Sequence, residues 1–187
     1  MQKLKLSDIR KNLNFRISKG MGFEWNRFVN GEYKKGVVDF DVYLPSIGMN
    51  LQRPLCWSLK QKQEFILSIL KDSAIPKICV ITHRGGSENN FSTHLLEIID
   101  GKQRINAYID FFNGAFALPT GHYYSDLADD AKSCLISFMT DSDDASVYFN
   151  EVISDEDKIA WFEQINFTGT SQDEEHLNNL RSNSQKA

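Results

Sequence analysis

The segment EIIDGKQR, residues 97–104, joins a predicted strand to a predicted helix and decides the fold of this chain. The apolar and β-branched residues before it predict a strand over 94–99. An apolar stripe at helical spacing follows, made of Ile105, Tyr108, Ile109 and Phe112. This stripe predicts a helix with one buried face. We expect Asp100 to be the N-cap of that helix, with Gln103 at the N3 position of a capping box.

Further strands are predicted on both sides of this segment. Residues 77–82 are β-branched and apolar, so we expect a strand antiparallel to residues 94–99. Residues 37–44 alternate enough to form another strand, and residues 45–50 read as a loop. The Gly- and Asn-rich residues 84–90 predict a turn. These segments together predict a small mixed sheet.

Three more helices are predicted from capping signals and apolar spacing. Ser58 and Gln61 have the spacing of a capping box, and the helix that follows should end near Asp72. A second helix is expected from about Asp155, and a third from Ser171. Strands and helices in this order predict an α+β chain.

Composition limits the class of protein. The chain has 187 residues, of which 41% are hydrophobic and 25% charged, which is typical of one soluble globular domain. Its apolar runs are too short to span a membrane. Three scattered cysteines predict reduced, buried thiols and a cytoplasmic protein. The oligomeric state is not predicted by any of these features.

Charge is distributed unevenly along the chain. Residues 1–36 carry nine Lys or Arg against three Asp or Glu, whereas the whole chain has a net charge of −4. We interpret residues 1–36 as a basic N-terminal extension, 37–181 as the folded domain and 182–187 as a flexible tail. The basic arm has two readings: a DNA contact, or a solvated arm that packs its aromatic side chains on the domain.

The start of the helix after Gly101 is a candidate anion site. Free N–H groups and the helix dipole attract an anion there, and a glycine lets a phosphate approach the backbone. Lys102 and Arg104 add positive charge, and Asp100 has the chemistry to hold Mg²⁺ or to accept a proton. The alternatives are structural: Asp100 and Gln103 only cap the helix, and Lys102 only faces solvent.

A second polar segment, QRPLCWS at residues 52–58, precedes the capped helix. Pro54 stiffens the backbone beside Arg53. The Arg53 guanidinium either converges on the same anion or stacks on Trp57. Trp57 itself is expected to be a packing residue.

Three motifs occur in order: QRPLCWS, IIDGKQRINAYIDFFNG and WFEQINFTGTSQDEEHL. With these motifs the chain resembles the GmrSD-type restriction system N-terminal domain family, a branch of the ParB/sulfiredoxin-like fold with a DGQQR motif. The resemblance covers residues 37–180. It departs from the usual family pattern at Lys102 and at Leu55, where an aromatic residue is usual. It implies a ParB/sulfiredoxin-like mixed sheet with packed helices and a nucleotide-phosphate site.

The resemblance also implies roles for individual residues. Catalytic roles fall on Asp100, Arg104, Gln103 and Arg53. Nucleotide- or phosphate-binding roles fall on Gly101, Lys102, Gln52, Asn166 and Thr170. Asp100 is in addition the implied metal ligand.

The expected function is therefore a phosphoryl-transfer domain, either an NTP hydrolase or a kinase, that uses ATP or GTP with Mg²⁺ and acts on DNA or is regulated by it. Two alternatives stay open: a DNA-binding or nuclease module of a restriction or anti-phage system, and a non-catalytic nucleotide sensor. Restriction enzymes of this family carry a C-terminal His-Asn-His nuclease half. The 187 residues contain none, so we expect no DNA cleavage by this chain alone.

Overall fold

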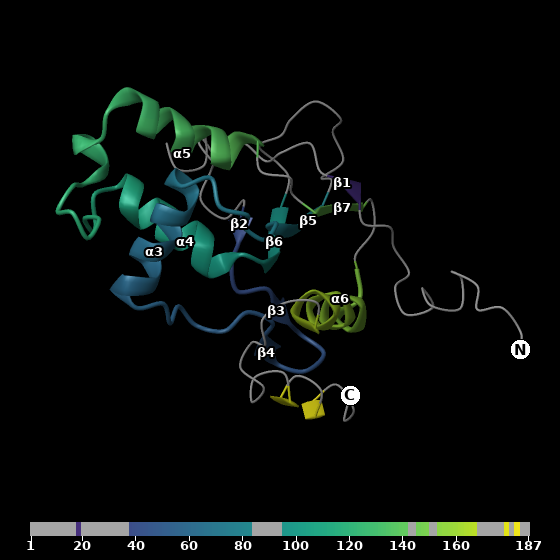
Figure 1. Ribbon diagram of the computed structural model, residues 1–187. Coiled ribbons are helices and arrows are strands. Elements are labelled where there is room, and N and C mark those ends of the chain that lie inside the picture. The colour runs from purple at the N-terminus through teal and green to yellow at the C-terminus, as the bar shows by residue number, and fades with distance from the viewer. Residues whose placement is uncertain are drawn as a thin grey trace, which may run out of the picture.

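The computed structural model describes residues 18–19, 38–83, 95–141, 145–149, 153–167, 178–179 and 182–183. These residues form a five-stranded mixed sheet, a two-stranded hairpin and several helices (Figure 1). The main sheet contains β1 (Ser18–Lys19), β2 (Val38–Asp39), β5 (Cys79–His83), β6 (Leu95–Asp100) and β7 (Ala145–Phe149). The hairpin consists of β3 (Tyr43–Leu44) and β4 (Met49–Asn50). The helices are α3 (Leu59–Leu70), α4 (Lys102–Phe112), the short 3-10 helix η2 (Tyr124–Asp126), α5 (Asp129–Asp141) and α6 (Asp155–Phe167).

The main sheet has the order β1-β7-β5-β6-β2. The central pair, β5 and β6, is antiparallel, which confirms the pairing expected from the sequence. β7 runs parallel to β5, and β2 runs parallel to β6. The mixed sheet and the packed helices confirm the α+β class. The ParB/sulfiredoxin-like assignment stays a prediction.

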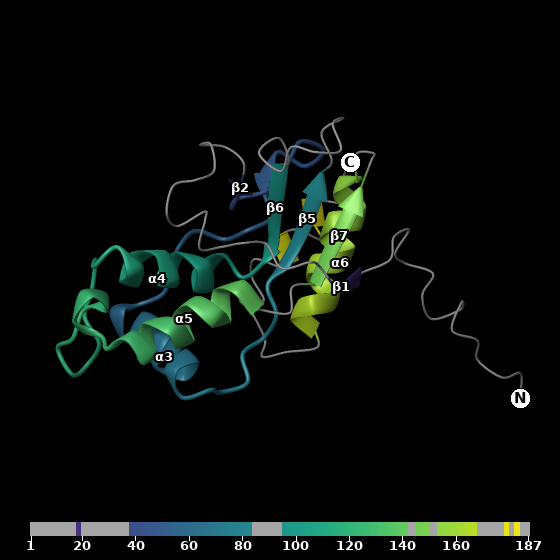
Figure 2. The same ribbon diagram turned by 90° about the horizontal axis from the view of Figure 1, so that it is seen from above.

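The sheet separates two hydrophobic clusters. On one face, α3, α4 and α5 pack against Ile78, Val80 and Ile98. On the other face, α6 and the hairpin pack against Cys79, Ile81 and other residues of the central strands. The alternation along β5 is the period-two pattern of a strand that is buried on both faces. Figure 2 accordingly shows α6 beside the strands and apart from α3, α4 and α5.

The predicted stripe on α4 does face the core. Ile105 and Tyr108 are buried, and Ile109 and Phe112 pack half-buried at its edge. Burial raises the pKa of the Tyr108 phenol, so this side chain stays neutral in the core.

Several elements differ from the sequence-based expectation. Residues 37–44 form two short strands instead of one, because the Asp39 carboxylate accepts hydrogen bonds from the N–H groups of Asp41 and Val42 and turns the chain. The expected loop 45–50 contains β4. Helix α5 and strand β7 were not predicted, because both lie in an acidic stretch that masks their weak apolar patterns.

Other expectations are settled in part. The capping box of Ser58 and Gln61 at the start of α3 is confirmed. All three cysteines are free, but Cys56 and Cys134 are exposed, so the expectation that every cysteine is buried was wrong. Among the described residues, no helix has the length and apolar character needed to cross a membrane. The turn at 84–90 and the helix from Ser171 lie outside the described residues, and the domain boundaries stay predictions.

A buried ion pair fixes α6 on the sheet. The Lys158 Nζ lies 2.8 Å from Glu97 Oε1, and both side chains are less than a tenth exposed. Glu97 lies on β6 and points to the same face as Ile99, which contacts α6. Sequence analysis did not identify this pair, because nothing in the periodicity marks two charges as buried.

Removing one partner of this pair should destabilise the fold strongly. We expect Lys158→Met to lower the free energy of unfolding by about 3 kcal/mol, because it takes the Lys158 charge away from the buried Glu97 carboxylate. The double variant Glu97→Gln/Lys158→Met should recover to within about 1 kcal/mol of wild type. The exposed pair Lys60–Glu64 is the control, and Lys60→Met should change stability by about 0.5 kcal/mol or less. Urea unfolding followed by circular dichroism measures all three, and an unaffected Lys158→Met would contradict the assignment.

Candidate functional site

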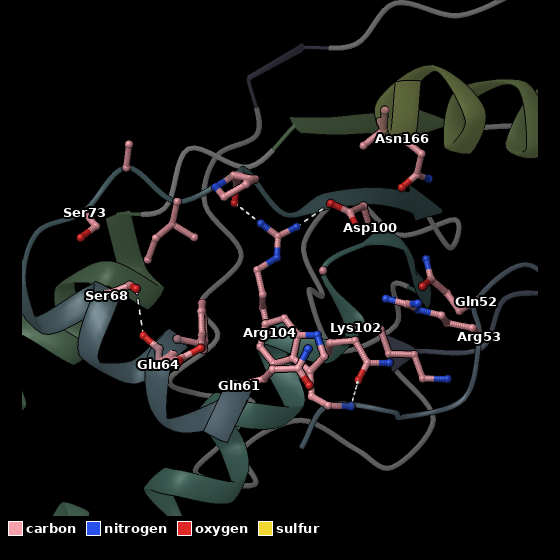
Figure 3. Close-up of a pocket in the computed structure, with 18 residues that line it drawn as sticks. Gln52, Arg53, Gln61, Glu64, Ser68, Ser73, Asp100, Lys102, Arg104 and Asn166 are labelled. Carbon is pink, nitrogen blue, oxygen red and sulfur yellow. Dashed lines mark hydrogen bonds and ion pairs between the residues drawn. The ribbon is translucent and has the colours of Figure 1, made fainter. Parts of the chain in front are cut away.

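A cavity of about 700 Å³ opens where β6 ends and α4 begins (Figure 3). Its wall brings together nearly all of the residues that the sequence predicted for the site: Gln52, Arg53, Asp100, Gly101, Lys102, Gln103, Arg104 and Asn166. Thr170 lies outside the described residues. Three segments that are far apart in the chain therefore meet in one space.

The joint between strand and helix depends on Gly101. This residue, not Asp100, is the N-cap of α4, and its backbone has a φ of +113°. An added Cβ would lie only 3.1 Å from the side chain of Ile78. The expectation that Asp100 and Gln103 form a capping box was therefore wrong. No side chain of the described residues caps α4, so the N–H groups of its first turn have no capping partner there, and the residues of this turn line the cavity.

Asp100, the last residue of β6, forms an ion pair with Arg104 in the first turn of α4. Arg104 Nη2 lies 2.5 Å from Asp100 Oδ2, and the two side chains are 11% and 16% exposed. The same guanidinium donates hydrogen bonds to the carbonyl oxygens of Pro76 and Lys77. Arg104 thus ties the segment that enters β5 to the start of α4. Figure 3 shows its guanidinium lying between the two sides of the cavity.

Two glutamines hold the loop that carries Arg53. Gln103 Oε1 accepts hydrogen bonds from the N–H groups of Cys56 and Trp57, and its Nε2 donates to the Pro54 carbonyl. Gln52 is 8% exposed, and its Nε2 donates to the carbonyl oxygens of Ile98 and Ile99 on β6. The loop is therefore anchored on both sides of Arg53.

The guanidinium of Arg53 is left available. Arg53 is half-buried in the cavity wall, and within the described residues no acceptor or carboxylate binds it. Its neighbour Trp57 packs edge-on against Phe65 at 5.6 Å, as expected for a packing residue, and also lines the cavity. A cation with an anchored backbone and an open side chain is suited to bind an anion.

Lys102 is not the solvent-facing charge that one reading of the sequence expected. Its side chain is 7% exposed, and its Nζ lies 2.5 Å from Oδ1 of Asp41. Asp41 is 59% exposed and comes from the turn after β2. Sequence analysis missed Asp41, because its partner lies 61 positions away.

Helix α6 contributes Ile165 and Asn166 to the wall. Asn166 is 7% exposed, and its Nδ2 donates to the carbonyl oxygen of Phe162 at 2.7 Å. Lys158, Phe162 and Asn166 follow one another at intervals of four residues, so they share one stripe of the helix. The ion pair of Lys158 with Glu97 therefore also determines where Asn166 lies relative to Asp100.

The opposite side of the cavity was not identified from the sequence. It is formed by Glu64 and Ser68 of α3 and by Ser73, which face Asp100 and Asn166 across Arg104 (Figure 3). Ser68 donates to the Glu64 carbonyl, and the Glu64 carboxylate is largely exposed. The spacing of Glu64 and Ser68, one turn apart, was the available signal for a shared polar face.

A comparison with protein families supports the resemblance found in the sequence. A family model described as "GmrSD restriction endonuclease, N-terminal domain" matches residues 32–186. The chain therefore belongs to this family. No curated protein and no solved structure matches the chain.

Substitution of Gly101 should cost more than substitution of a glycine in open space. We expect Gly101→Ala to lower the free energy of unfolding by about 2 kcal/mol or more, because it combines backbone strain with a clash at Ile78. Gly114, with φ +73° and no atom near its absent Cβ, is the matched control, and Gly114→Ala should cost only about 1 kcal/mol. Thermal unfolding of both variants measures the difference. Equal losses of stability in the two variants would mean that the Ile78 side chain moves away from the added Cβ without a measurable cost in free energy.

Proposed function

We propose that this chain, as a member of the GmrSD restriction endonuclease N-terminal domain family, binds a nucleoside triphosphate in the cavity and serves a DNA restriction or anti-phage system. The observation that carries the proposal is the position of the Arg53 guanidinium at a cavity that also contains the start of α4, neither of which has a side-chain partner within the described part of the chain. The family supports the role in restriction, and the cavity supports the nucleotide.

The phosphate groups would bind between Arg53 and the first turn of α4. Unbonded N–H groups at a helix start and the helix dipole favour negative charge. Gly101 begins the helix without a capping side chain, so none competes with a phosphate for these N–H groups within the described residues. Lys102 and Arg104 contribute positive charge nearby, although Asp41 and Asp100 already balance it. Arg53 is therefore the cation that we assign to the phosphate.

The cavity is larger than a phosphate requires. Its volume of about 700 Å³ lies within the range of small-molecule sites and leaves room for a sugar and a base. Trp57, Phe65, Ile75 and Pro76 give part of the wall an apolar character. Such a wall suits the flat, weakly hydrated surface of a nucleobase.

Asp100 is the candidate for chemistry. One carboxylate oxygen accepts from Arg104, which leaves the other for Mg²⁺ or for a proton from the attacking hydroxyl or water. Arg104 would hold this carboxylate in place and stabilise charge on the transferred phosphate. Gln103 would act by holding the Arg53 loop. These roles suit an NTP hydrolase and, with a hydroxyl acceptor, a kinase.

A second candidate function is a nucleotide sensor that binds without turnover. The hydrogen bonds that Arg104 already makes favour this sensor function. Its guanidinium is already engaged with Asp100 and with the carbonyl oxygens of Pro76 and Lys77, so fewer of its donors remain for a transition state. The two functions differ in turnover, not in binding.

Nucleotide affinity should depend on Arg53. We expect Arg53→Gln to weaken binding of the preferred nucleotide about tenfold or more, because a charge-assisted contact to phosphate is lost. Lys71→Gln, which removes an exposed positive charge just after α3 at a residue that does not line the cavity, is the control and should bind as wild type does. Calorimetric titration of ATP, GTP, CTP and UTP with Mg²⁺ measures both variants.

The same samples decide between the two functions. Phosphate release or conversion of the nucleotide by wild type, lost in Asp100→Asn, would identify an enzyme, and nucleotide binding without turnover, with and without DNA, would identify a sensor. If none of the four nucleotides binds wild type, the proposal is wrong.

DNA binding should depend on the basic residues of 1–36. We expect replacement of Lys3, Lys5, Arg10 and Lys11 by Gln to weaken DNA binding and to flatten its salt dependence, because fewer counterions are released. This variant keeps Ser18–Lys19, which pairs with β7. Fluorescence anisotropy with a labelled duplex between about 50 and 200 mM salt measures it. An unchanged salt slope would favour the alternative of a solvated arm.

A further inference from the structure

Two buried amide side chains present their oxygen atoms, not their nitrogen atoms, to the cavity. Gln52 uses both hydrogens of Nε2 on the carbonyl oxygens of Ile98 and Ile99. Asn166 donates from Nδ2 to the Phe162 carbonyl. Both side chains are more than nine-tenths buried and line the cavity. Within the described residues, no donor reaches Gln52 Oε1 or Asn166 Oδ1.

These oxygens are poorly suited to contact phosphate. A carbonyl oxygen carries partial negative charge and repels an anion, although the resemblance to the family assigned both residues to nucleotide or phosphate binding. A buried acceptor without a donor is also costly, so native proteins pair nearly all such groups with a partner, water or an ion. The missing partner must be a donor or a cation.

The third free oxygen in the same part of the cavity belongs to Asp100. Arg104 occupies only its Oδ2. Asp100, Asn166 and Gln52 all line the cavity, and Figure 3 shows the three side chains on the same side of Arg104. A carboxylate and amide carbonyl oxygens are the donor set that hard divalent cations prefer.

We propose that Asp100 and Asn166 bind a divalent cation such as Mg²⁺ or Mn²⁺ through their free side-chain oxygens, and that Gln52 Oε1 accepts a hydrogen bond from a water on this ion. The inference deepens the proposed function. It rests on that function for the remaining ligands of the ion, which would be triphosphate oxygens at the start of α4. It gives Gln52 and Asn166 the role of acceptors in place of phosphate donors.

The position of Asn166 in this site is set by the sheet. From Glu97 to Asp100 the strand advances three residues, or about 10 Å. From Lys158 to Asn166 the helix advances eight residues, or about 12 Å. The buried pair Glu97–Lys158 at one end therefore brings Asn166 level with Asp100 at the other. Glu97 and Lys158 are positioning residues for the cation site.

The test uses a substitution that separates a cation ligand from a phosphate donor. Asn166→Asp adds a carboxylate, so it should bind Mn²⁺ about tenfold or more tightly than wild type, because affinity rises with ligand charge. Asn106→Asp is the matched control. Asn106 makes the same side-chain bond to a carbonyl four residues earlier, at 2.9 Å to Lys102, but does not line the cavity.

Mn²⁺ is titrated into the full chain without nucleotide, and the free ion is measured by electron paramagnetic resonance. We expect tighter binding in Asn166→Asp, unchanged binding in Asn106→Asp and loss of binding in Asp100→Asn. If Asn166→Asp fails to fold, as judged by circular dichroism, Asn166→Ala should weaken binding relative to Asn106→Ala.

Wild-type affinity in Asn166→Asp, or equal tightening in Asn106→Asp, would overturn the inference. The nucleotide titration is independent of this result. Cation binding with this pattern in a chain that binds no nucleotide would uphold the cation site and refute the proposed function.

Discussion

The left-handed backbone at Gly101 is the constraint on which the site depends. It lets the chain pass from β6 into α4 without a capping side chain and within contact distance of Ile78. Asp100 is thereby left at the end of the strand, and the N–H groups of the helix stay open. A capping box at this position would have used the same N–H groups and closed the site to an anion. Glycine at this position costs conformational entropy on folding, but it leaves these N–H donors available to a ligand.

Most of the architecture was readable from the sequence, because the elements with strong periodicity are also the ones that build the core. The strand before Asp100, its antiparallel partner and the helices that follow Ser58 and Gly101 were all predicted. Helix α5 and strand β7 were not. Of the α5 side chains, Leu135 is the fully buried one in the described part. The helix therefore has a weak apolar periodicity, which the acidic residues around it obscure.

The site was predicted as a set of residues but not as a set of contacts. The three motifs converge on one cavity, yet the direction of each polar atom depends on partners that are distant in the sequence. Gln52 and Gln103 hold backbone, and Lys102 pairs with Asp41. No local pattern tells whether an amide presents its nitrogen or its oxygen to a cavity. For Gln52 and Asn166 this difference decides whether they suit a phosphate, as the resemblance implied, or a cation beside Asp100, as we propose.

The cavity also lies where two separately packed layers meet. Phe65 belongs to the cluster on one face of the sheet, and Phe162, the hydrogen-bonding partner of Asn166, belongs to the cluster on the other. A ligand that touches both Asn166 and the α3–α4 side therefore contacts residues from both layers. Its binding free energy adds to their mutual cohesion, so an occupied molecule should unfold more cooperatively than an empty one. The bound ligand thus holds the two layers together.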